Sequence, residues 1–113
     1  MDMQLKKGLL DVLVLSTLLK EDSYGYRIIR DLAPVSEISE STLYPILKRL
    51  EAAKLLNVRT AEHNGRLRKY YSITKAGKAR IDEFLSEWQD VMKVYRFIES
   101  ERRLSESAPH DAN

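Results

Sequence analysis

The 113-residue sequence contains no cysteine, only two histidines and a single tryptophan, with four glycines and three prolines. Without cysteine the chain can form no disulfide framework and carry out no thiol chemistry, which fits a reducing cytoplasm. His63 and His110 stand alone, with neither cysteine nor clustered carboxylates near them, so they make no credible metal site. We therefore expect no metal and no cofactor.

Long apolar runs and catalytic motifs are also missing. The segment Leu9–Leu15 is interrupted by Asp11 and is far too short to cross a bilayer, and no small-residue cleavage site follows it. We expect neither a membrane span nor a signal peptide. The chain has no glycine-rich phosphate loop and no nucleophile pattern around His63. The sequence therefore predicts a protein that is not an enzyme, built as one domain with an appended helix.

The charge that is present is unevenly distributed. Residues 1–47 carry five basic and seven acidic side chains, residues 48–80 carry ten and two, and residues 81–113 carry four and eight. The middle third thus has a net charge of +8, although the whole chain has only +2. Such a concentration attracts polyanions. The alternative is a solvated surface that only keeps the protein soluble.

Helical spacing of apolar residues predicts a first helix over about Gln4–Lys20, buried on more than one side. A second, short helix is predicted over Tyr24–Leu32, with an N-cap from Glu21-Asp22-Ser23 and an end imposed by Pro34. The inward positions of these two helices are Leu5, Leu9, Val12, Leu13, Leu15, Leu18, Leu19, Ile28, Ile29 and Leu32.

A third helix is predicted to reach roughly Leu55, capped by Ser39 or Ser41. Pro45 favours Ser41, because a proline deeper in the helix removes a hydrogen bond and clashes with the preceding turn. The stripe of Leu43, Ile46, Leu47 and Leu50 would face the core, and Thr42, Tyr44, Lys48 and Arg49 would point away from it.

Two strands, Asn57–Glu62 and Leu67–Thr74, are predicted to flank a tight turn at Asn64-Gly65, which is the strongest short hairpin signal. Thr74 would then cap a long last helix, and the tail from about Ser105 is expected to be disordered.

This order of elements predicts a mostly α fold with a small β-hairpin: a winged helix-turn-helix with an added C-terminal dimerisation helix. The expected division is 1–76 for the winged helix, 77–104 for the helix and 105–113 for the tail. The last helix would expose a wide apolar seam, so we expect a homodimer with the first helix contributing. The seam and first-helix positions are Leu9, Leu13, Phe84, Leu85, Trp88, Val91, Met92, Tyr95 and Ile98.

Three groups of residues together resemble the PadR family of bacterial transcriptional regulators, over roughly Leu5 to Ile98. They are Tyr24-Gly25-Tyr26; Thr42-Leu43-Tyr44-Pro45 followed by Leu47, Leu50 and Glu51; and Gly65-Arg66 with Lys69-Tyr70-Tyr71-Ser72-Ile73-Thr74 and Gly77. In having a single helix after the wing, the chain resembles the compact subfamily of this family. Two positions depart from the family pattern: Lys54 stands where glycine is common after the reading helix, and Leu67 replaces a frequent proline in the wing. They suggest a looser helix end and an altered wing tip.

The resemblance implies a dimeric repressor that a small, often aromatic, effector releases from double-stranded DNA. The candidate DNA contacts are Ser41, Thr42, Tyr44, Lys48, Arg49, Arg66, Arg68 and Lys69. Short hydroxyl side chains suit phosphates, longer side chains reach base edges, and the wing cations suit the backbone or minor groove. The alternative for Tyr44 is packing on a neighbouring helix, and for the wing a plain solvated hairpin.

Trp88 has two interpretations: ordinary dimer core, or a platform where two copies hold a flat ligand near the two-fold axis, as in some PadR members. Two other functions also stay open for the whole chain. One is a winged-helix adaptor that binds proteins without reading DNA, because fold alone does not decide function. The other is a sensor for which aromatic ligands matter more than DNA.

Overall fold

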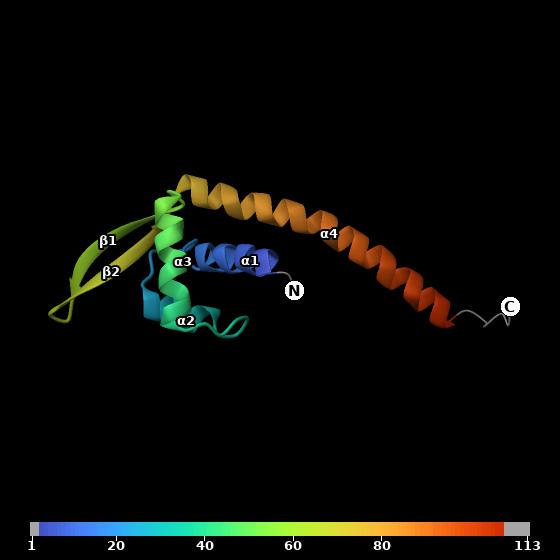
Figure 1. The fold of residues 1–113 in the computed structure, drawn as a ribbon, viewed down its shortest axis with the longest axis horizontal. Helices are drawn as coiled ribbons and strands as arrows, with labels where there is room; N and C mark the ends of the chain where they lie inside the picture. The colour runs from blue at the N-terminus through green and yellow to red at the C-terminus, as the bar shows by residue number, and fades with distance from the viewer. Residues whose placement is uncertain (1–2, 108–113) are drawn as a thin grey trace. The chain divides into compact units, whose positions relative to one another are not determined.

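The computed structural model describes residues 3–107, with side chains from Gly8 onward. Its elements are α1 (Met3–Ser16), α2 (Gly25–Leu32), α3 (Glu40–Ala52), β1 (Leu56–His63), β2 (Arg66–Ile73) and α4 (Lys75–Ser107). The predicted fold class is confirmed: helices precede a two-stranded antiparallel hairpin, and a long helix follows it (Figure 1). In the described part of the chain no helix is long and apolar enough to span a bilayer.

The chain forms two compact units, Met1–Asp82 and Glu83–Asn113, and α4 begins in the first and continues through the second. The predicted boundary after residue 76 falls near the start of α4. The helix also continues to Ser107, past the predicted start of the tail at 105. The remainder of that predicted tail, including His110, lies outside the described residues.

The core of the first unit lies where α1, α2, α3 and β1 pack on one another. Its fully buried side chains come from all of these elements: Leu15, Ile28, Leu43, Leu47, Leu50, Leu56 and Val14. The predicted α3 stripe is buried throughout, whereas on the first helix Leu9 and Leu13 are half-buried and Leu19 is exposed. The side chain of Leu5 lies outside the described residues.

The first helix ends at Ser16 and not at the predicted Lys20. The hydroxyls of Ser16 and Thr17 donate to the carbonyls of Leu13 and Val14, both at 2.7 Å. Such local bonds compete with the helical ones, and the chain leaves the helix through tighter turns. Apolar spacing could not detect this because the buried Leu18 keeps the helical period.

The predicted caps of α2 and α3 are wrong by one and two residues. Tyr24 is the N-cap of α2 and makes no side-chain cap bond. Ser39, not Ser41, caps α3, and its Oγ accepts from the amide of Thr42 at 3.3 Å. Pro45 therefore lies inside the helix. We attribute the earlier start to the Ser39 cap and to Glu40 in the first turn, where an acidic side chain complements the helix dipole.

The end of α3 is a complete Schellman motif, so the predicted looser cap is wrong in its hydrogen bonding. The amide of Leu55 donates to the Leu50 carbonyl at 2.9 Å and the amide of Lys54 donates to the Glu51 carbonyl at 2.9 Å. The helix ends at Ala52, before the predicted Leu55. Lys54 takes the left-handed conformation, with φ of 62°, although it carries a Cβ.

Replacing Lys54 by glycine is expected to raise the free energy of unfolding by about 0.5–1 kcal/mol. Glycine adopts this φ without the steric cost that a Cβ brings. This gain in the folded state exceeds the additional conformational entropy that glycine loses on folding. Urea unfolding measures the difference. Lys54→Ala keeps the Cβ, so it should stay close to the wild type, and equal stabilities of the two variants would contradict the explanation.

The hairpin has the predicted two-residue turn. His63 pairs with Arg66 around Asn64 and Gly65, whose φ angles are 53° and 79°. A single bridge adds the segment before α2 to the sheet: the amide of Ser23 donates to Tyr71 O at 3.0 Å, and the amide of Tyr71 donates to Ser23 O at 2.7 Å. The wing is thus attached by main-chain bonds to the start of α2.

Ser23 is only 1% exposed, and among the described residues its hydroxyl has no hydrogen-bond partner. Replacing Ser23 by alanine is expected to raise the free energy of unfolding by about 1 kcal/mol, because an unsatisfied buried hydroxyl disappears while the main-chain bridge stays. Thermal or urea unfolding measures this. A loss of stability would contradict the prediction and indicate a partner for the hydroxyl.

The first turn of α4 packs closely on the end of α3. Thr74 Oγ1 accepts from the amide of Gly77 at 3.0 Å, which confirms Thr74 as the cap, and it donates to the Lys54 carbonyl at 2.8 Å. A Cβ at Gly77 would collide with the carbonyl oxygen of Leu55. Glycine is therefore required at this position. The same contacts hold the start of α4 against the end of α3, and the wing connects these two helix ends.

Candidate nucleic-acid interface

The start of α3 presents hydroxyl groups to solvent. Ser41 and Thr42 are both exposed, and the oxygens of both lie near Ser39 Oγ, at 2.8 Å and 3.3 Å. Ser39 itself caps the helix, so the hydroxyls sit around a helix N-terminus. Hydroxyls and main-chain amides in this arrangement suit phosphate oxygens.

Tyr44 lies one turn further along α3 and is 46% exposed. Its ring rests on the start of α2, because a Cβ added to Gly25 would be 2.7 Å from the Tyr44 hydroxyl oxygen. The packing interpretation of Tyr44 therefore describes one side of the ring, while the rest of the side chain faces solvent. Gly25 allows α2 and α3 to approach this closely.

Lys48 and Lys69 lie around one shallow hollow of about 300 Å³ between α3 and β2, with Tyr44 and Tyr71 also in its lining. Both lysines are exposed. Lys69 also lines a neighbouring hollow of about 550 Å³ with Tyr26, Leu67 and Arg68. The helix and the wing thus present cations to one continuous surface.

Tyr71 is 5% exposed, and burial raises the pKa of its hydroxyl, with smaller contributions from Tyr44 and Glu51. The sign of this shift keeps Tyr71 neutral around pH 7, since the usual value for tyrosine is near 10. Glu51 also lines the hollow beside Lys48, so the two lysines there act on an anion next to one carboxylate.

Arg49 differs from the prediction that it points away from the core with Lys48. Its guanidinium forms an ion pair with Asp11 of α1, and both side chains are partly buried, at 38% and 18% exposed. Helical spacing could not find this pair, because Asp11 is 38 residues away in sequence. Arg49 connects α3 to α1 in this structure.

The wing cations are not equivalent. Arg66 and Lys69 are exposed, as is Leu67 at 79%, whereas Arg68 is half-buried with its Cζ 3.9 Å from the centre of the Tyr24 ring. Arg68 and Tyr70 share one face and Tyr71 lies on the other, as strand alternation predicts. The sequence alone gave no role to Tyr24 at the wing, and no local signal could do so, because Tyr24 and Arg68 are far apart in sequence.

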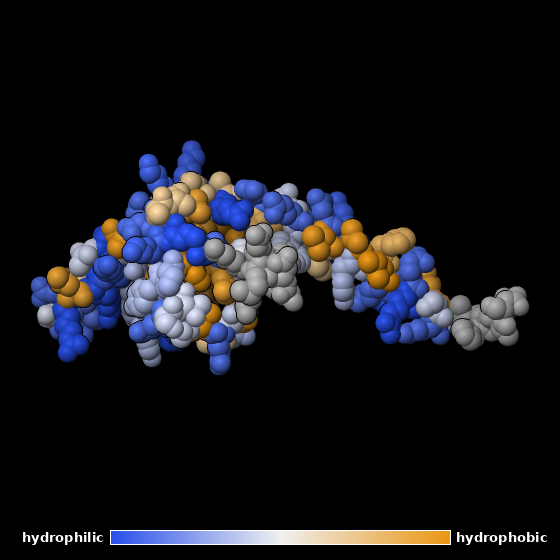
Figure 2. Space-filling view, in the orientation of Figure 1, coloured by the Kyte–Doolittle hydropathy of each residue, from blue (hydrophilic) through white to orange (hydrophobic). Residues whose placement is uncertain are grey.

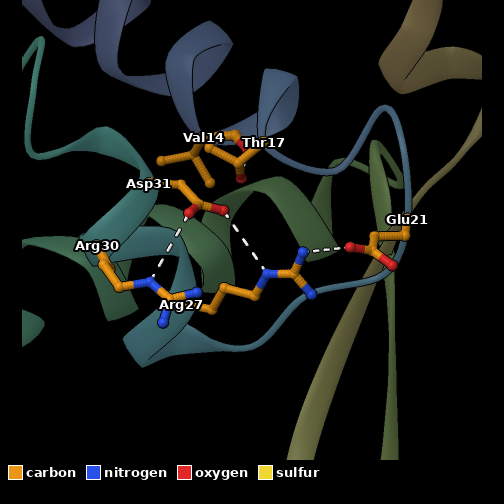
Figure 3. A network of polar contacts seen from close by, with 6 residues as sticks. All are labelled: Val14, Thr17, Glu21, Arg27, Arg30 and Asp31. Carbon is orange, nitrogen blue, oxygen red and sulfur yellow. Dashed lines mark hydrogen bonds and ion pairs between the residues drawn. The ribbon is translucent and has the colours of Figure 1, made fainter.

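The cations of α2 are largely neutralised by neighbouring acids (Figure 3). Arg27 lies between Glu21, with which it forms an ion pair, and Asp31 at 3.8 Å, and Arg30 lies 4.0 Å from Asp31. The hydrogen bond that Arg27 donates to the Glu21 carboxylate is the main cause that raises the pKa of Arg27. The positive surface therefore belongs to α3 and the wing and does not extend along α2.

The second unit carries the predicted seam on α4. Its apolar side chains are exposed over the outer part of the helix, where Figure 2 shows orange groups between blue ones. Trp88 and Phe84 are half-buried, with ring centres 5.8 Å apart. The exposed members of the predicted seam are Leu85, Val91, Met92, Tyr95 and Ile98, and the same helix also exposes Val94, Phe97 and Leu104. Ordinary protein surfaces expose single, scattered apolar residues, whereas this helix exposes many of them along one segment.

Comparison with known proteins agrees with this geometry. The model of the transcriptional regulator PadR-like family matches residues 14–83. A structure from Streptococcus mutans UA159 is 39% identical, covers 93% of this chain and 94% of its own, and has a TM-score of 0.75. A PadR-like transcription factor from Bacteroides fragilis is 33% identical, with 84% and 94% covered and a TM-score of 0.75. The PadR of Bacillus subtilis, solved in complex with operator DNA, is 26% identical, with 68% and 46% covered and a TM-score of 0.65.

Proposed function

Because this chain belongs to the PadR-like family of transcriptional regulators, we propose that it is a dimeric repressor that binds a short dyad in double-stranded DNA. The observation that carries this proposal is the shared hollow of Lys48 and Lys69, which joins the α3 surface to the wing. A groove-sized helix beside a cationic hairpin is suited to contact the major groove and the adjacent backbone together. The operator-bound Bacillus subtilis relative supports DNA as the ligand, and this role places the protein in the cytoplasm.

Within this interface, we assign the contacts according to exposure. Lys48, Arg66 and Lys69 bind phosphates or base edges, and Ser41 and Thr42 bind phosphates at the helix start. Tyr44 adds its exposed edge. Arg49 and Arg68 are engaged inside the protein, so we assign them structural roles.

The exposed apolar side chains of α4 support the proposal that the protein is a dimer. A dimer would remove them from water and would supply the two copies of α3 that a dyad requires. A protein-binding adaptor remains the alternative, but it has no need of a mid-chain charge of +8.

Binding to the chain's own upstream DNA tests the proposal. A fluorescent duplex of that region should bind in a gel shift or anisotropy titration, with affinity falling steeply as salt rises. A scrambled duplex of equal length is the control, since only sequence-specific binding distinguishes a regulator from a merely cationic protein. Equal affinity for the two duplexes at about 150 mM salt would favour the adaptor.

A small aromatic effector that releases DNA is the finer part of the proposal. Trp88 is half-buried beside Phe84, and in a dimer its ring would be available for stacking on a planar compound.

Planar aromatic compounds are therefore expected to quench Trp88 fluorescence and to weaken operator binding over the same concentration range. Because Trp88 is the single tryptophan, the signal reports this position alone. Trp88→Phe removes the signal but keeps a ring, so release of DNA measured by anisotropy should persist in that variant. Quenching without any effect on DNA binding would contradict the effector role.

A further inference from the structure

One face of the hairpin carries a set of stacked rings and guanidinium groups, which we call the wing stack: Arg59, Tyr70, Tyr24 and Arg68. The Cζ of Arg59 lies 4.6 Å from the centre of the Tyr70 ring. The Tyr70 and Tyr24 rings meet edge to face, with centres 5.9 Å apart and planes at 75°. Arg68 closes the set, with its Cζ 3.9 Å from the centre of the Tyr24 ring.

Polar contacts reinforce the wing stack. Arg59 pairs with Asp22 at 3.3 Å, and within the stack Arg68 Nη1 donates to the Tyr70 hydroxyl at 3.4 Å. On the main chain, Ser23 exchanges two hydrogen bonds with Tyr71. The short segment 22–24 before α2 therefore holds the hairpin through both its side chains and its backbone.

This attachment matters because a two-stranded hairpin has little stability by itself in water. The tip of the wing, with Arg66 and Leu67, is exposed. An interface that uses α3 and the wing together needs both at a fixed spacing, since a contact group held loosely loses binding energy to ordering.

We propose that the wing stack positions the wing for DNA, and that Arg68 acts through Tyr24 and not by binding a phosphate. The proposal deepens the DNA-binding function given above and rests on it. Tyr24, Tyr70 and Arg68 are thus positioning residues. Arg66 and Lys69, its exposed neighbours on the same strand, are the contact residues.

Replacement by lysine distinguishes an arginine that contacts a phosphate from an arginine that stacks on an aromatic ring. It keeps the positive charge that a phosphate needs, but it has no planar guanidinium to lie over a ring. A phosphate contact should therefore tolerate the change better than a stacked group does.

The test compares Arg68→Lys with the matched control Arg96→Lys on the operator duplex, because Arg96 is exposed on α4, outside the DNA interface and the wing stack. We expect about a three- to tenfold loss of affinity for Arg68→Lys and wild-type affinity for Arg96→Lys. The slope of binding against salt should stay unchanged in both, since no charge is removed. Equal affinities of the two lysine variants would overturn the proposal.

A second pair of variants tests the ring. Tyr24→Phe keeps the aromatic face and should bind DNA as the wild type does, whereas Tyr24→Leu should lose about three- to tenfold. Wild-type affinity of Tyr24→Leu, or an equal loss in both variants, would overturn the role of the ring.

Amide hydrogen exchange in the free protein separates this inference from the proposed function. Exchange across Arg59–Tyr70 should be faster in Tyr24→Leu and Arg68→Lys than in the wild type, and unchanged in Tyr24→Phe and Arg96→Lys. If the wild type bound no operator, this measurement would still decide the point. Unchanged exchange in Tyr24→Leu would overturn the wing stack as a positioning device.

Discussion

Replacing Val91 and Ile98 by glutamate is expected to convert the protein into monomers and to abolish operator binding. The two side chains are 50% and 60% exposed, and they lie seven residues apart on one face of α4. In a single chain the glutamates stay solvated at little cost. In a dimer that buries this face, each would lose its hydration without a partner, at a cost of several kcal/mol. We expect the dimer dissociation constant to rise by about 1,000-fold or more.

Sedimentation velocity measures the change in mass, and anisotropy measures the loss of DNA affinity. The matched control is Gln89→Glu with Arg96→Gln, which also lowers the charge by two and lies on exposed positions of the same helix, also seven residues apart. This control should remain dimeric. Two monomeric variants, or a dimeric Val91→Glu/Ile98→Glu protein, would contradict a dimer built on the α4 seam.

The fold could be predicted from the sequence because its strongest signals are local. The α3 stripe of Leu43, Ile46, Leu47 and Leu50 has helical spacing, and all four residues are buried. Asn64-Gly65 fixed the hairpin register because both residues accept positive φ. The helix ends were predicted less well. At the end of α1 the hydroxyl of Ser16 donates to the Leu13 carbonyl, which apolar spacing does not detect.

The roles of individual cations could not be predicted, because they depend on groups distant in sequence. Arg49 has the helical position of a DNA contact, but α1 brings Asp11 to it. Arg68 lies between two exposed cations in sequence, but the segment before α2 places the Tyr24 ring under it. A basic residue in a predicted interface therefore identifies the surface, while its partner in the folded chain decides its role.

Replacing Lys48, Arg66 and Lys69 together by alanine is expected to weaken operator binding by about 100- to 1,000-fold at about 100 mM salt. All three side chains are exposed, so the fold should survive. A dimer loses six cations, and at about 0.9 per phosphate the slope of log affinity against log salt should become shallower by about five.

The control removes three cations elsewhere: Lys93, Arg96 and Arg103, all exposed on α4. It carries the same net charge as the contact variant and should keep nearly all of the affinity and the salt slope. If the two variants lost affinity equally, general charge would explain the binding and the assigned surface would be wrong. If only the contact variant lost affinity while its slope stayed at the wild-type value, these side chains would act on base edges or geometry and not on phosphates.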